Sequence, residues 1–156
     1  MRVHLCVVGR LRAGPERGLV DDYLARFDRT GRSLGLSLGS VTEIEDRKSG
    51  GIAAEAALLR RSVPKGATLW VLDERGVQAT SPDFASRVAD VRDAGHGDLV
   101  ICIGGADGLD PDLRGAAALA LSFGRMVWPH MLARVMLAEQ LYRAANILSG
   151  SPYHRA

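Results

Sequence analysis

Short apolar segments alternate along this chain with segments of helical periodicity, and this alternation constrains the fold more than any other feature. The runs that predict strands buried on both faces are residues 3–8, 67–73 and 99–103. Weaker strands are predicted at residues 34–44 and 125–128. Helices are predicted at about residues 16–28, 51–63, 82–94, 111–122 and 131–149. The order predicts a mostly parallel sheet flanked by helices, in one α/β domain spanning residues 1–156.

The segments that follow three of the predicted strands are unusual. In open parallel sheets, ligands bind beyond the carboxyl ends of the strands. Here Leu72 is followed by Asp73-Glu74-Arg75-Gly76, and Ile103 by a glycine-rich run at residues 104–108. The last predicted strand lies between Gly124 and Pro129-His130. We therefore expect these three loops to share one pocket.

The glycines at positions 104, 105 and 108 allow a chain to turn tightly or to approach a ligand closely. Their spacing differs from the dinucleotide-binding fingerprint, and the neighbouring Asp107 would repel a pyrophosphate. Two interpretations stay open on this pattern alone. The run is either a ligand-binding loop or a tight turn between a strand and a helix.

Composition restricts the class of protein. The chain has 156 residues, 47% of them apolar, and a formal net charge of +2, which permits nucleic-acid binding without indicating it. Cys6 and Cys102 lie inside buried-strand patterns, so we expect neither a disulfide nor a metal site. The sequence has neither an apolar run of membrane-spanning length nor a leader pattern, and a soluble cytoplasmic protein is expected.

The C-terminal segment, residues 150–156, carries three side chains that suit catalysis and RNA binding. Tyr153, His154 and Arg155 can stack on a base, move a proton and hold a phosphate. The alternative is a solvated tail, since chain termini are usually frayed.

The predicted closing helix has a broad apolar face that leaves room for a helix of a second subunit. Its Glu139 and Arg143 form a favourable i,i+4 pair. Among the histidines, His4 is predicted to be structural and His96 to lie in an exposed turn. His130 is expected either to cap the closing helix or to face the pocket.

Three motifs together resemble one family: IGGADGL at 103–109, WPHMLARVMLAEQLYRA at 128–144 and the terminal SPYHR. The chain resembles the ribosomal large-subunit methyltransferase H group of SPOUT methyltransferases. The resemblance implies a C-terminal trefoil knot, bound S-adenosylmethionine, no metal and a homodimer whose active sites are completed by the partner. It also implies methylation of N3 of one pseudouridine in 23S ribosomal RNA, on the assembled ribosome. The cofactor residues that it implies are Leu72, Gly105, Gly124, Arg125, Met126, Val127, Trp128 and Pro129.

The resemblance also suggests roles for the C-terminal side chains. His154 is the candidate base for the N3 proton, because an imidazole is mostly neutral at cytoplasmic pH. Tyr153 would stack on or orient the target base, and Arg155 would hold phosphate or stabilise negative charge on the uracil oxygens. Alternatively, proximity supplies most of the rate and His154 only positions the base. Two other classes stay open, a non-catalytic RNA-binding factor and a dinucleotide-dependent oxidoreductase.

Overall fold

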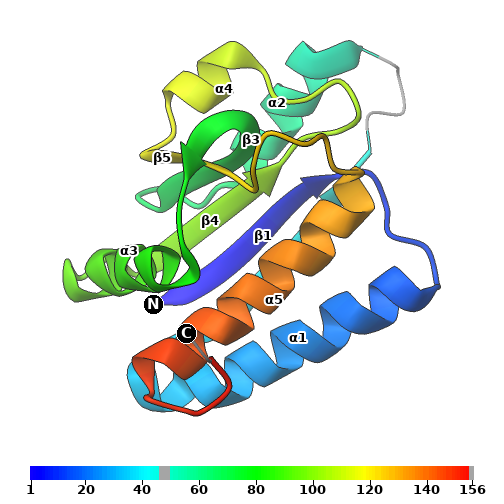
Figure 1. The fold of residues 1–156 in the computed structure, drawn as a ribbon. Coiled ribbons are helices and arrows are strands. Elements are labelled where there is room, and N and C mark those ends of the chain that lie inside the picture. The colour runs from blue at the N-terminus through cyan, green and yellow to red at the C-terminus, as the bar shows by residue number, and fades with distance from the viewer. Residues whose placement is uncertain (46–49, 155–156) are drawn as a thin grey trace.

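The computed structural model describes residues 1–45 and 50–154, and it has a parallel five-stranded sheet between two layers of helices (Figure 1). The strand order is β2-β1-β4-β3-β5, and every neighbouring pair is parallel. The strands are β1 (Arg2–Val8), β2 (Ser37–Ile44), β3 (Thr68–Gln78), β4 (Asp98–Ile103) and β5 (Leu119–Ser122). The helices are α1 (Pro15–Gly31), α2 (Gly51–Ser62), α3 (Ser81–Asp93), α4 (Pro111–Gly115) and α5 (His130–Leu148), with a short 3₁₀ helix at Arg32–Leu34.

The central strands β1 and β4 are mostly apolar because both faces of the sheet are covered. On β1, Leu5 and Val7 pack into a core with α1, α3 and α5, whereas Cys6 and Val8 pack into a second core with α2 and α4. Burying such a side chain fully stabilises the fold by about 1.5–3 kcal/mol. The prediction of doubly buried strands is confirmed, and Cys6 and Cys102 are buried free cysteines in register on β1 and β4.

The predicted C-terminal strand and the helix before it are wrong in position. The helix predicted at 111–122 ends at Gly115, and the last strand is Leu119–Ser122 rather than 125–128. Asp110 caps α4 by accepting from the backbone N–H groups of Asp112 and Leu113. Pairing of β5 with β3 outweighs the helix propensity of the alanine run before it. Residues 123–129 therefore form a loop at the carboxyl end of β5.

The segment predicted as a loop after Leu72 belongs to β3, but it bulges. Leu72 and Val77 both pair with Leu121, so the residues between them are displaced from the ladder at the carboxyl edge of the sheet. Gly76 permits the close approach of β5, because a Cβ at this position would lie 2.6 Å from the backbone of Ala120. The cap of α3 is also shifted by one residue, to Thr80, which forms a capping box with Asp83.

Candidate active site

The three predicted loops line one cavity of about 250 Å³ at the carboxyl edge of the sheet, as expected. The β3 bulge, the glycine-rich turn after β4 and the loop after β5 each contribute one wall. Six of the eight predicted cofactor residues line it: Leu72, Gly105, Gly124, Met126, Val127 and Trp128. Arg125 and Pro129 lie in the same loop without lining the cavity. Cofactor binding by these residues stays a prediction.

The glycine-rich run forms a tight turn, one of the two interpretations left open by its sequence, and the turn also borders the cavity. Gly108 N–H donates to the Gly105 carbonyl at 3.1 Å, and the two glycines form an isolated bridge. Gly108 has φ +86°, so the turn itself requires glycine there. Gly105 instead lines the cavity, where an added Cβ would lie 3.1 Å from Val8 Cγ1 and close to the Glu55 carboxylate. The turn therefore brings bare backbone to the cavity wall.

The loop after β5 is held by hydrogen bonds at its first residues and exposes apolar side chains further along. Gly124 has φ +113°, and its N–H donates to Ser122 Oγ at 3.1 Å. Ser122 Oγ also donates to the Glu74 carbonyl at 3.1 Å, which joins this loop to the β3 bulge. Beyond the fixed start, Met126 is 71% exposed and Val127 is 81% exposed. Further exposed apolar side chains follow at Trp128, Met131 and Leu132.

His130 is the first residue of α5 and faces the cavity, which decides between the two predicted roles. Pro129 occupies the cap position, and no side chain caps the helix. Burial, and then the nearby guanidinium of Arg134, lower the pKa of His130 below its ordinary value. The imidazole at the cavity wall is therefore neutral at physiological pH.

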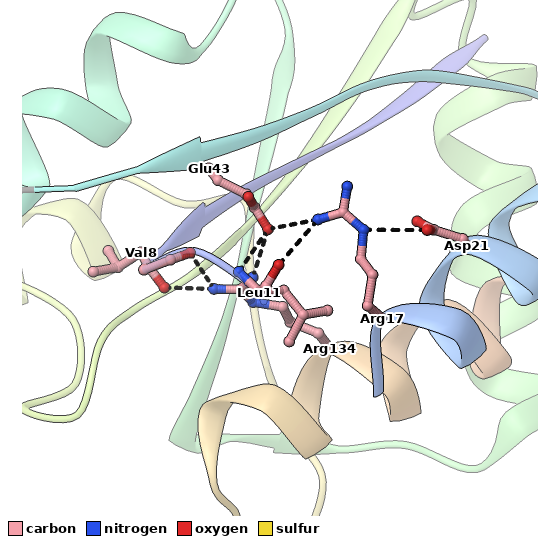
Figure 2. A network of polar contacts seen from close by, with 7 residues as sticks. Val8, Leu11, Arg17, Asp21, Glu43 and Arg134 are labelled. Carbon is pink, nitrogen blue, oxygen red and sulfur yellow. Dashed lines mark hydrogen bonds and ion pairs between the residues drawn. The ribbon is translucent and has the colours of Figure 1, made fainter. Parts of the chain in front are cut away.

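Arg134 ties the start of α5 to the ends of two strands (Figure 2). This buried side chain donates from Nη2 to the Val8 and Gly9 carbonyls, each at 2.6 Å, and from Nη1 to Glu43 Oε1 at 3.1 Å. Glu43 also accepts from the Leu11 N–H at 2.9 Å. The sequence alone does not predict this pairing, because Glu43 lies 91 residues from Arg134 along the chain.

The C-terminal segment folds back onto the second half of α5. Tyr153 Oη donates to Glu139 Oε1 at 3.1 Å, and Arg143 Nη2 donates to the same oxygen at 2.7 Å. The Tyr153 ring lies 4.6 Å from the Tyr142 ring, and the Arg143 guanidinium lies 4.9 Å from the Tyr153 ring centroid. The predicted Glu139–Arg143 pair thus exists, and it anchors the tail. We call Glu139, Tyr142, Arg143, Tyr153 and His154 the tail cluster.

Protonation within the tail cluster follows from these contacts. Burial, together with the hydrogen bond to Glu139, raises the pKa of Tyr153 to about 12, so its phenol stays protonated at neutral pH. His154 Nδ1 lies 3.5 Å from Arg143 Nη1. Because a guanidinium only donates, we assign Nδ1 as the acceptor and the imidazole proton to Nε2. Arg155 lies outside the described residues, as does most of the basic link predicted at 47–51.

The other two histidines lie away from the cavity. His4 is buried, with Nε2 2.8 Å from Asp98 Oδ1 and Nδ1 accepting from the Ser40 N–H at 3.0 Å, which confirms a structural role. His96 is exposed in the turn between α3 and β4.

Neither Tyr153 nor His154 lines the cavity of the three loops. Along α5, His130 and Arg143 are separated by about 20 Å of helix axis, at about 1.5 Å per residue. A larger cavity of about 470 Å³ lies between α1, α3 and α5, and Glu139 and Phe123 both line it. The tail cluster and the loop after β5 are therefore connected by an open groove, not by direct contact.

Comparison with known proteins identifies the family. A family model described as "Predicted SPOUT methyltransferase" matches residues 1–154. A probable methylase family protein from Haemophilus influenzae shares the fold, with a TM-score of 0.52 and 12% identity over 99% of this chain and 70% of its own. The chain belongs to the SPOUT methyltransferase family. Relatives from Dinoroseobacter shibae and Ruegeria pomeroyi, 69% and 66% identical over 99% of both chains, are named "Ribosomal RNA large subunit methyltransferase H".

The described part of the chain has neither a membrane-spanning helix nor a metal-binding group. Within residues 1–45 and 50–154, no helix is long and apolar enough to cross a membrane. In the same ranges, no group of three or more His, Cys, Asp or Glu side chains is arranged to hold a metal ion.

Proposed function

We propose that this protein is an S-adenosylmethionine-dependent methyltransferase of large-subunit ribosomal RNA. The observation that carries this proposal is its 69% identity, along the whole chain, to a relative named ribosomal RNA large subunit methyltransferase H. The target that we propose is N3 of one pseudouridine in 23S RNA, on the assembled ribosome. Action on ribosomes would place the protein in the cytoplasm.

The cavity of the three loops fits S-adenosylmethionine by the chemistry of its lining. Leu72, Met126 and Trp128 offer apolar surface, and Gly105 leaves room for a ligand beside bare backbone. Backbone groups at residues 124–129 are the candidates to read the adenine edge. When bound, the cofactor supplies a methyl group on a positively charged sulfur. The trefoil knot implied by the resemblance is part of this proposal, with the loop after β5 inside it.

A homodimer is the second part of the proposal. The exposed apolar side chains at residues 126–132 adjoin the cavity, and monomers seldom leave such a patch uncovered. The tail cluster lies outside the cavity of its own chain. Both observations support an active site in which one subunit binds the cofactor and the other contributes the C-terminal segment.

The tail cluster suits a proton transfer from the target base. N3 loses its proton and bonds to the methyl carbon, while the carbon–sulfur bond breaks and leaves its electron pair on sulfur. His154 is the proposed acceptor of that proton, and Nδ1 would have to leave Arg143 to take it. Tyr153 is excluded as the base at neutral pH by its raised pKa of about 12. It would orient the tail, and Arg155 would hold phosphate or stabilise charge on the uracil oxygens. Alternatively, His154 only positions the base.

The deciding experiment is transfer of labelled methyl from S-adenosylmethionine to unmodified ribosomes. Free large subunits and naked ribosomal RNA serve as parallel substrates. Label at one pseudouridine of assembled ribosomes is the expected result. Cofactor binding without transfer to any of the three would contradict the RNA target but keep the cofactor site. Binding of reduced nicotinamide dinucleotide in its place would favour the oxidoreductase interpretation instead.

A further inference from the structure

Asp73 is a buried carboxylate at the wall of the cavity to which neither the sequence nor the family comparison gave a role. It is the first residue of the β3 bulge, directly after the paired Leu72, and its side chain is only 4% exposed. Asp73 Oδ1 accepts from the Arg75 N–H at 2.9 Å. Oδ2 accepts no hydrogen bond from residues 1–45 or 50–154. One oxygen of a carboxylate at the cavity wall is thus left for a ligand.

The cations near Asp73 lie beside its other oxygen. Arg114 Nη1 is 3.6 Å from Oδ1 and Arg75 Nε is 3.7 Å from it, both too long for hydrogen bonds. Arg114 Nη1 is buried and has no hydrogen-bond partner among the described residues. The two guanidiniums therefore offset part of the charge of Asp73 without occupying Oδ2.

The rest of the cavity lining is acidic as well. Glu74 and Asp107 join Asp73, and the one guanidinium in the lining is that of Arg75, as far as the described residues go. His130 adds no charge, because burial and Arg134 lower its pKa. Such a lining favours a positively charged ligand and disfavours a phosphate.

We propose that Asp73 helps this cavity to distinguish S-adenosylmethionine from S-adenosylhomocysteine through the charge on sulfur. The inference rests on the proposed function, because it assumes that the cavity is the cofactor site. The two ligands share the adenosine and the amino acid and differ by the methyl group and its positive charge. A carboxylate that faces the charge favours the substrate form of the cofactor, and it releases the neutral product more readily after transfer.

Calorimetric titration of the full-length protein tests this inference without any turnover. The ligands are S-adenosylmethionine, S-adenosylhomocysteine and sinefungin, in which an amine-bearing carbon replaces the sulfonium and keeps a positive charge. In Asp73→Asn, the ratio of the Kd for S-adenosylhomocysteine to that for S-adenosylmethionine should fall about tenfold, as a lost nearby opposite charge predicts. Sinefungin should weaken together with S-adenosylmethionine.

Asp93→Asn is the control, because it neutralises a carboxylate at the end of α3, outside the cavity, whose side chain is 65% exposed and well screened. It should leave the ratio within about twofold of the wild-type value. Asp73→Ser serves as a second neutral variant if Asp73→Asn does not fold. Equal weakening of all three ligands would overturn the inference, since Asp73 would then contact a group that they share. Unchanged affinities would overturn it as well. Failure of the wild-type protein to bind any of them would contradict the proposed function instead.

Discussion

The two ends of α5 differ in the kinds of groups that surround them. The start of the helix borders a cavity formed by backbone turns, glycines and apolar side chains, and Arg134 anchors it to the distant ends of β1 and β2. The second half carries a dense side-chain network, in which Glu139 accepts from both Arg143 and Tyr153. Backbone and apolar groups suit the binding of a cofactor, whereas titratable side chains suit proton transfer. In the proposed mechanism, α5 separates the cofactor-binding residues from the residues that take the proton, and a second copy of the chain brings them together.

Removal of residues 153–156 tests the role proposed for the C-terminal segment, and it should have the largest effect on methyl transfer. We expect methyl transfer to fall at least about 100-fold, the usual contribution of a positioned acid or base. Affinity for S-adenosylmethionine, measured by calorimetry, should stay within about twofold, because these residues lie outside the cavity. An active truncated enzyme would contradict the role given to the tail.

Gly105→Val should weaken cofactor binding at the start of α5 without changing the tail cluster. The added side chain would press on Val8 and on the Glu55 carboxylate at the cavity wall, and we expect S-adenosylmethionine affinity to drop about 10- to 100-fold. Gly18→Val is the control, because a Cβ at this α1 position meets nothing within 4 Å. Light scattering should find the same oligomeric state for both variants. Normal affinity of Gly105→Val would place the cofactor elsewhere.

Mixed dimers should decide whether the cofactor cavity of one subunit works with the C-terminal segment of the other. At S-adenosylmethionine concentrations well below the weakened Kd, Gly105→Val and the truncated chain should each be nearly inactive alone. Co-expression with different tags allows the mixed dimer to be purified from the rest. Before purification, an equal mixture should recover about a quarter of wild-type methyl transfer, because half of the dimers have one complete site. If both ends act within a single chain, the purified mixed dimer will be inactive.

The smallest effect concerns the charge state of His130. Its pKa in the folded protein is lowered, so the neutral form stabilises the fold above about pH 6.5, the ordinary histidine value, and this contribution is lost as the pH falls. The free energy of unfolding in urea should therefore drop more between pH 7.5 and pH 5.5 in the wild type than in His130→Asn. His96→Asn, at an exposed turn, should follow the wild-type curve. Parallel curves for all three proteins would argue against a buried neutral imidazole at the cavity.

Sequence patterns predicted the elements whose signals are local. The buried strands β1 and β4 and the helix α5 follow directly from apolar spacing. The region after Asp110 was predicted wrongly, because an alanine-rich run suits a helix until an edge strand competes for it. Its correct strand ends at Ser122, so residues 124–129 are a loop and not a strand.

The candidate site was predictable only in part, and for a related reason. Strand ends identified the three loops of the cavity, since that inference needs topology alone. Arg134 and Glu43 were missed, because their partnership depends on which distant segments the fold brings together. The anchoring of Tyr153 by Glu139 was also missed, although the Glu139–Arg143 pair was recognised.

The contacts of Arg134 also bear on the order in which the molecule forms. Its hydrogen bond to the Val8 carbonyl joins groups 126 residues apart, nearly the whole chain. Contacts of such high sequence separation slow folding, because the entropy of loop closure is lost before the contact forms. Arg134 of the last helix can make all of these hydrogen bonds only once the ends of β1 and β2 lie together. The cavity at its start is therefore completed late, and during synthesis it cannot exist before the ribosome has released almost the entire chain.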